Sequence, residues 1–106
     1  MKKEIEYAVF RLEMDHVLII HEVKDYEAWK KIFDAAAPIR KIAGEISYQV
    51  LKWDTNANKI VHFSKWSSIS NAKAFFESDK LVEIRKQAGV KAPEFIYLEL
   101  LEEGML

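Results

Sequence analysis

The sequence of 106 residues contains no cysteine, only three glycines and two prolines, and sixteen basic residues against seventeen acidic ones. Without cysteine, disulfides, thiolate zinc sites, iron–sulfur clusters and a cysteine nucleophile are excluded. A net charge of −1 gives no electrostatic footprint for nucleic acid or an anionic membrane. The aliphatic run at 17–20 is too short to span a bilayer or to form a signal segment. We therefore expect a cytoplasmic protein that binds neither nucleic acid nor membrane.

Half of the residues are hydrophobic and 31% are charged, which is the balance of an ordinary globular domain. No linker or internal repeat divides the chain, and its length suits one domain. We expect an N-terminal arm or extra strand over residues 1–15, a single domain over 16–102 and a tail over 103–106. Within the arm, strand and helix spacing fit almost equally well, and the strand is favoured.

Hydrophobic spacing predicts four strands and two interrupted helical regions. The strands are expected at 16–23, 45–53, 59–66 and 95–101, and the helical regions at 26–43 and 69–88. Asp25, Ser68 or Ser70, and Ser78 are predicted helix N-caps, Pro38 a helix break, and Gly44 and Gly89 helix ends. The order β-α-β-β-α-β predicts an α+β, ferredoxin-like fold, with the helices on one face of an antiparallel sheet.

The two faces of the sheet carry different side chains. The more uniformly apolar sets are expected to face the helices: Leu18 and Ile20, Val61 and Phe63, and Ile96, Leu98 and Leu100. The opposite sets would lie on the open face: Val17, Ile19 and His21; Ile60, His62, Ser64 and Trp66; Phe95, Tyr97 and Glu99; and Ser47, Gln49, Leu51 and Trp53. Such an apolar face marks an interface. We expect a homodimer that packs the open faces together around an apolar cavity with a few polar groups.

The chemical candidates come from this predicted open face. His21 and His62 titrate near neutrality when unperturbed, so either one can serve as a catalytic base, although hydrogen-bonded interior histidines are the plainer interpretation. The predicted substrate-binding residues are Gln49, Trp53, Trp66, Tyr97 and Glu99. Arg40 follows the helix break and is expected to be solvated. No spaced histidine pattern is present, so we expect no metal and no cofactor.

Several segments resemble the small dimeric α/β-barrel proteins of the antibiotic-biosynthesis-monooxygenase-like superfamily, in a subgroup that is largely uncharacterised. They run in order from about residue 16 to about residue 101: HEVKDYEAW at 21–29, Phe33-Asp34, RKIAG at 40–44, FSKW at 63–66, AKAF at 72–75, SDKL at 78–81, and AGV at 88–90 before Pro93-Glu94. The resemblance implies a ferredoxin-like protomer and a homodimer whose sheets form a barrel.

The same resemblance implies several functions, because the superfamily includes cofactor-independent monooxygenases of polyaromatic quinols, haem-degrading enzymes, polyketide cyclases and isomerases. The haem-degrading branch is disfavoured, since the histidine ligand it uses would follow His62, and the sequence has none there. Two hypotheses stay open. One is a cofactor-independent monooxygenase, cyclase or isomerase acting on a small hydrophobic or aromatic molecule. The alternative is a non-catalytic dimeric module that binds a small molecule or serves as a structural unit.

Overall fold

A computed structural model describes residues 15–106, and the predicted arm or strand before Asp15 lies outside these residues. The elements in order are β1 (Asp15–Val23), α2 (Tyr26–Ala35), α3 (Ala37–Ala43), β2 (Glu45–Trp53), β3 (Asn56–Trp66), α4 (Ile69–Phe76), α5 (Asp79–Gln87) and β4 (Val90–Glu99). With each helical region split in two, this is the predicted ferredoxin-like arrangement. No helix of the described part of the chain is long and apolar enough to cross a membrane.

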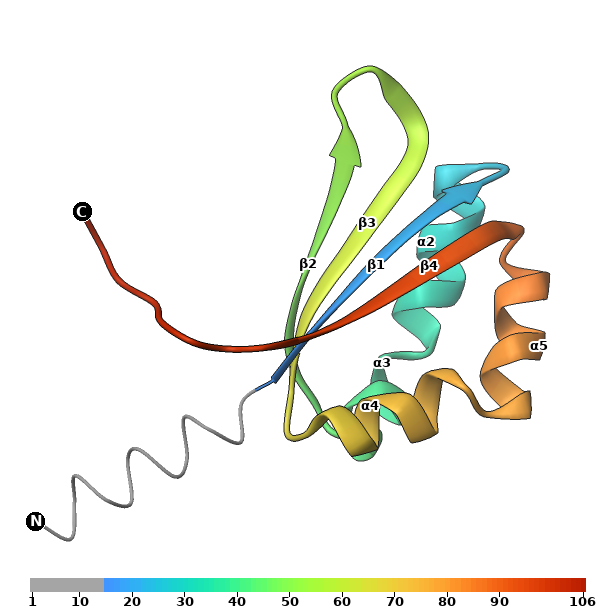
Figure 1. Ribbon diagram of the computed structural model, residues 1–106. Coiled ribbons are helices and arrows are strands. Elements are labelled where there is room, and N and C mark those ends of the chain that lie inside the picture. Colours follow the sequence, from blue (N-terminus) through green and yellow to red (C-terminus); the bar gives the residue numbers. More distant parts are fainter. Residues whose placement is uncertain (1–14) are drawn as a thin grey trace, which may run out of the picture.

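The four strands form one antiparallel sheet in the order β2-β3-β1-β4. The four helices of residues 15–106 lie on one side of the sheet, and no described element covers the other side (Figure 1). On β1 and β3, His21 pairs with Ile60 and Ile19 pairs with His62. The two histidines are therefore diagonal neighbours on the same face of the sheet, a register that the sequence did not determine.

The helix boundaries follow the predicted signals. The side chains of Asp25, Ser68 and Ser78 each accept a hydrogen bond from a backbone N–H in the first turn of α2, α4 and α5. Pro38 stands in the first turn of α3, where it removes no helical hydrogen bond. Gly44 ends α3 with a φ of 124°, a backbone conformation that side-chain-bearing residues rarely adopt.

The predicted assignment of the two faces is wrong for β1, β3 and β4. Val17, Ile19, Ile60 and Trp66 are buried beneath the helices, and His21, His62 and Ser64 are buried with them. Phe95 and Tyr97 pack against the same core. The uniformly apolar residues Leu18, Ile20, Val61 and Phe63 are half-buried and lie on the open face instead. The helices therefore cover the more polar set of strand residues.

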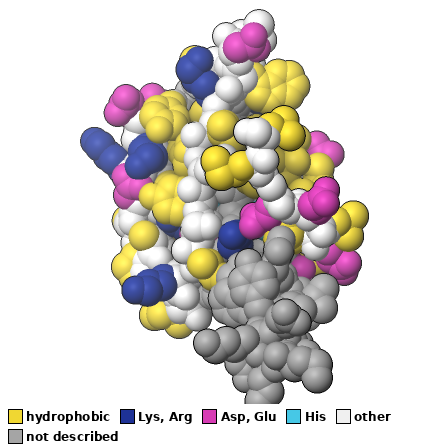
Figure 2. All heavy atoms as spheres, turned by 90° about the vertical axis from the view of Figure 1, so that its left-hand side faces the viewer, with side chains coloured by type: hydrophobic (Ala, Val, Ile, Leu, Met, Phe, Trp, Pro, Cys, Tyr) yellow, Lys and Arg dark blue, Asp and Glu magenta, His cyan; other side chains and the backbone are white. Residues whose placement is uncertain are grey.

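The open face carries the predicted residues of β2. Gln49 pairs with Phe63 and Leu51 with Val61 across the sheet, and both β2 residues are exposed. Figure 2 views this side and shows hydrophobic side chains gathered over the sheet, with charged side chains around them. The ring of Trp53 lies 3.8 Å from the Lys59 ammonium. Beyond β4, the exposed C-terminal segment leaves the sheet (Figure 1).

Strand β4 begins at Val90, earlier than the predicted start at Phe95. Pro93 is accommodated because β4 is an edge strand and because the pairing with β1 is irregular there. Glu22 pairs with Lys91 and Ile20 with Glu94, so two residues of β4 stand opposite the single residue His21. This is a β-bulge, and Ala92 within it has a φ of 45°.

Candidate functional site

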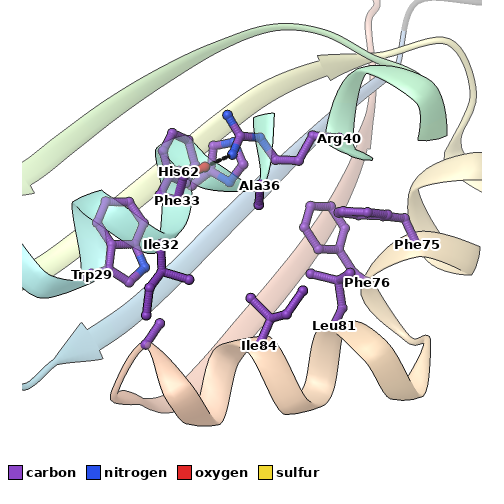
Figure 3. A pocket seen from close by; sticks show the side chains of 11 residues that line it. Trp29, Ile32, Phe33, Ala36, Arg40, His62, Phe75, Phe76, Leu81 and Ile84 are labelled. Atoms are coloured by element: carbon purple, nitrogen blue, oxygen red, sulfur yellow. Dashed lines mark hydrogen bonds between the residues drawn. The ribbon is translucent and has the colours of Figure 1, made fainter. Parts of the chain in front are cut away.

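A cavity of about 70 Å³ lies between the helical face of the sheet and the four helices. Its wall is mostly aromatic and aliphatic, with two polar side chains, Arg40 and His62. Figure 3 shows His62, Phe33 and Arg40 on one side, with Leu81 and Ile84 of α5 across from them. The full lining comprises Trp29, Ile32, Phe33, Ala36, Arg40, His62, Phe75, Phe76, Leu81, Ile84 and Ala88. An apolar wall with few polar groups is typical of small-molecule sites, although this cavity is smaller than the roughly 300 Å³ or more that such sites usually have.

A buried charged network forms the polar wall of this cavity. The Glu45 carboxylate lies 2.6 Å from Arg40 Nε through Oε1, and 2.8 Å from His62 Nε2 through Oε2. Arg40 is 4%, Glu45 9% and His62 3% exposed. Buried charges are tolerated when each is paired and hydrogen-bonded, and here all three side chains are. The network therefore holds the imidazole in one orientation at the cavity wall.

Local chain geometry brings Arg40 to this place. The break between α2 and α3 turns the second helix so that the guanidinium stacks 3.7 Å from the centre of the Phe33 ring. Arg40 also donates to the Phe33 carbonyl, one of the helix-end acceptors of α2 (Figure 3). Gly44 then reverses the chain, so that Glu45 begins β2 within reach of Arg40.

The charge state of Glu45 determines the tautomer of His62. Burial alone would raise the pKa of the Glu45 carboxyl, but His62 and Arg40 outweigh burial and hold that pKa below its usual range. An ionised carboxylate only accepts hydrogen bonds, so His62 Nε2 must carry the hydrogen. In a neutral imidazole the lone pair is then on Nδ1, for which no hydrogen-bond partner is found within residues 15–106. This is the arrangement of a base oriented by a carboxylate.

His21 is buried beside this site and differs from His62. It is 5% exposed, its ring lies 5.3 Å from the Trp29 ring, and neither ring nitrogen has a partner within the described residues. Burial lowers the pKa of His21 to about 4, and the nearby His62 and Arg85 act in the same direction. The imidazole is therefore neutral at physiological pH, with one donor and one acceptor nitrogen.

The structure separates the predicted site residues into two groups. His21, His62, Trp66 and Tyr97 share the helical face, whereas Gln49 and Trp53 lie on the open face. Trp66 is fully buried and donates from Nε1 to Ser64 Oγ over 2.7 Å. Glu99 is exposed at the end of β4. Only His62 of the predicted residues lines the cavity, and the roles assigned to all seven stay predictions.

Sequence reasoning missed Arg40 and Glu45. Arg40 was expected to be solvated, and this expectation is wrong because Glu45 and the Phe33 carbonyl satisfy a buried guanidinium. The available signal was an arginine and a glutamate five residues apart, on either side of a helix-ending glycine. Among residues 15–106 no group of three potential metal ligands comes together.

Known structures share this fold. The oxygenase SnoaB from Streptomyces nogalater, described as cofactor-independent, has a TM-score of 0.70 and 10% identity, over 86% of this chain and 96% of its own. A Caulobacter crescentus protein, proposed to be an antibiotic biosynthesis monooxygenase, has a TM-score of 0.66 and 19% identity, over 92% and 99%. A Nitrosomonas europaea protein of unknown function has a TM-score of 0.67 and 15% identity, over 91% and 97%.

The chain has the antibiotic-biosynthesis-monooxygenase fold. This confirms, for the fold, the resemblance carried by the sequence segments. No family model and no curated protein sequence matches the chain, so the likeness is one of structure alone. Structures with this fold include both an oxygenase and a protein of unknown function, and the fold therefore does not fix the reaction.

Proposed function

We propose that the protein is a proton-abstracting enzyme that acts, without a cofactor, on a small hydrophobic or aromatic molecule held in the cavity between sheet and helices. The observation that carries this proposal is the Arg40–Glu45–His62 network at the wall of an otherwise apolar cavity. Purely structural packing would favour apolar groups at such a buried place.

The residues of the network have distinct roles in this proposal. His62 Nδ1 takes a proton from a weakly acidic O–H or C–H group of the bound molecule. Glu45 stabilises the imidazolium that forms, and Arg40 keeps the carboxylate ionised and fixed in position. The aromatic walls exclude water, which strengthens these interactions. The product of this step is a substrate anion, which is the common first intermediate of oxygenation, cyclisation and isomerisation.

Oxygenation is the version favoured by the structural likeness to SnoaB. An electron-rich aromatic anion can reduce O₂ directly, so that no flavin or metal is needed. The cavity limits the size of the substrate, because about 70 Å³ is half of the roughly 150 Å³ that holds benzene in an engineered cavity. We therefore propose a substrate of one ring or less, whose entry moves the helices slightly apart.

The test is O₂ uptake with 1,4-hydroquinone in the absence of added cofactor. His62→Gln removes the base but keeps an amide that can donate to Glu45, and it should lower the protein-dependent rate by about 100-fold or more. The matched control is His16→Gln, which changes a histidine on the open face. Equal rates in wild type and His62→Gln would contradict the role of His62, provided that both proteins give native NMR spectra.

A second candidate is a non-catalytic module that binds a small molecule. The observation in its favour is the completeness of the Arg40–Glu45–His62 pairing, which is sufficient for a structural polar network. Small apolar molecules would then bind in the cavity without being changed. Binding of hydroquinone, seen as shifted methyl resonances of Leu81 and Ile84, without any protein-dependent O₂ uptake would favour this candidate.

The open face supports a further part of the proposal, a homodimer. Half-buried Leu18, Ile20, Val61 and Phe63 form an apolar surface across the sheet, opposite the helices. We propose that two copies pack these faces together. In this dimer each cavity would lie within one protomer, under its own helices, and not between the two sheets.

A further inference from the structure

His21 is a buried polar side chain without a hydrogen-bond partner among residues 15–106. Both of its ring nitrogens are inaccessible and lack a hydrogen bond within residues 15–106. Leaving a buried donor or acceptor unpaired is costly, and native proteins rarely do so without a reason such as a ligand. A leucine of similar size would fill the same space at lower cost. The place of His21 in the core therefore calls for a polar group that the described part of the chain does not provide.

The backbone beside His21 is also unusual. Ala92 and Pro93 of β4 stand together opposite His21, and Ala92 has a φ of 45°, which is strained for a residue other than glycine. Bulges of this kind occur next to binding sites, where they redirect side chains. Two independent features, the unpaired ring and the bulge, thus meet at one position of the sheet.

Arg85 of α5 brings a positive charge to the same region. Its Nη1 donates to the Phe76 carbonyl over 2.9 Å, and its guanidinium lies 4.9 Å from the Phe95 ring centre. Phe95 pairs with Ile19 and is therefore a diagonal neighbour of His21 on the helical face. No carboxylate of residues 15–106 forms an ion pair with Arg85, although the side chain is half-buried. A half-buried guanidinium suits a carboxylate ligand.

Trp29 stands between His21 and the cavity. Its indole lines the cavity, and the His21 ring packs against it, whereas His21 itself does not reach the cavity wall. Phe76, whose carbonyl accepts from Arg85, and Ile84, which precedes Arg85 in α5, line the cavity as well. Movement of this one indole would open the cavity toward His21, and Arg85 lies against Phe95 on the same face of the sheet.

We propose that His21 and Arg85 form an anion subsite of the cavity, which takes the carboxylate of a small organic acid while the aromatic wall holds its apolar body. His21 donates one hydrogen bond to the carboxylate, and Arg85 neutralises its charge. This inference rests on the proposed ligand cavity and narrows its ligands to small acids with an apolar body of about one ring. His62, the diagonal neighbour of His21 on the same face of the sheet, then faces the apolar body.

The test compares three probes of similar shape: benzoate, benzamide and toluene. Wild-type protein at pH 7 should bind benzoate about tenfold more tightly than benzamide, because a charged ligand gains the stronger hydrogen bonds. Side-chain ¹⁵N resonances of His21 should shift with benzoate and remain unchanged with toluene. This readout needs no variant, and Trp29 fluorescence should change in the same titration.

Two variants and a control locate the subsite. His21→Leu and Arg85→Met should each weaken benzoate binding about tenfold and leave toluene binding unchanged. Lys86→Met removes an exposed cation from the next position of α5 and should have no effect. Equal affinity for benzoate and benzamide would overturn the subsite, as would an equal loss of benzoate binding in Lys86→Met and Arg85→Met. In either case, toluene binding would still support the ligand cavity. Failure of all three probes to bind would overturn the cavity and the subsite together.

Discussion

Two histidines on neighbouring strands have opposite environments, and the difference comes from single contacts. His62 is hydrogen-bonded to the Glu45 carboxylate, and that carboxylate is hydrogen-bonded to Arg40. The negative charge of Glu45 is therefore balanced by Arg40. His21 lies two residues further along β1 than Ile19, the partner of His62, packs against Trp29 and has no polar partner within the described residues. One imidazole is thus held in place by a carboxylate, and the other is kept neutral by burial.

The low pKa of His21 predicts how stability depends on pH. The ordinary pKa of 6.5 applies to the unfolded chain, and the folded value is about 4. Between these values the unfolded chain binds a proton that the folded protein does not, so the free energy of unfolding falls as the pH drops. From pH 7 to pH 5, His21 alone should lower the free energy of unfolding by about 2 kcal/mol. His21→Leu should lose that part of the slope, as measured by urea unfolding at the two pH values.

The chosen pH range keeps other groups out of the comparison. The pKa of Glu45 is held below its ordinary 4.5, so the stability it contributes is lost only at lower pH. His16, whose pKa burial also lowers, is present in both proteins and cancels in the difference. His21→Leu should also be at least as stable as wild type at pH 7, since it removes an unpaired polar group. An unchanged pH slope in His21→Leu would show that His21 is not buried in neutral form.

At the scale of the element, the short turn between α3 and β2 positions the polar wall of the cavity. Gly44 has a φ of 124°, and a Cβ atom there would lie 2.5 Å from Ser67 Oγ. Its carbonyl accepts from Ser67 N, which ties the turn to the end of β3. Gly44→Ala should therefore lower the free energy of unfolding by about 2 kcal/mol, measured with urea.

The matched control for this prediction is Gly104→Ala. A Cβ atom on Gly104 meets nothing within 4 Å, so the free energy of unfolding of Gly104→Ala should stay at the wild-type value. In Gly44→Ala, the side-chain resonances of Arg40 and His62 should also shift, because Glu45 follows directly in the chain. Equal unfolding free energies for the two alanine variants would mean that the turn accepts a side chain without strain.

Local signals predicted the elements well, because each depends on neighbours in the chain. The caps at Asp25 and Ser78 and the end at Gly44 act through hydrogen bonds and backbone angles within a few residues. Strands β3 and β4 start earlier than expected, at Asn56 and Val90, because pairing with a neighbouring strand extends them. The bulge opposite His21 depends on such long-range pairing and was not predicted.

The choice of the face under the helices failed because apolar character alone does not separate a core from an interface. The open face is uniformly apolar in its middle, while the buried face contains His21, His62 and Ser64. A better signal lies at the strand ends. On the open face, the charged residues Glu22 and Lys59 pair with each other near the strand ends. On the helical face, the strand-end residues Val23 of β1 and Trp66 of β3 are apolar and buried. Charged residues at the strand ends indicate the open face, because the rim of an interface is polar and exposed to solvent.

At the scale of the whole molecule, the helices form one layer against the sheet, and no element of residues 15–106 covers the sheet's other face (Figure 1). An apolar face of this extent is uncommon on a monomer. The C-terminal segment exposes further apolar side chains, since Leu101 is 94% and Met105 98% exposed after the end of β4. A second copy supplies an equal apolar face, and a two-fold pair would cover both sheets at once.

Phe63→Lys tests this arrangement, because Phe63 lies on the open face, stacked 5.2 Å from the His16 ring. Wild type should sediment at twice the chain mass of 12.4 kDa, and Phe63→Lys at the single mass, since an unpaired charge cannot be buried in the interface. The variant should keep its helical circular dichroism, because the core lies on the other side of the sheet. Lys80→Glu, an exposed change on the helical side, should remain dimeric. Sedimentation of the wild type at the single mass, at concentrations up to 100-fold above those of the assays, would rule out the dimer.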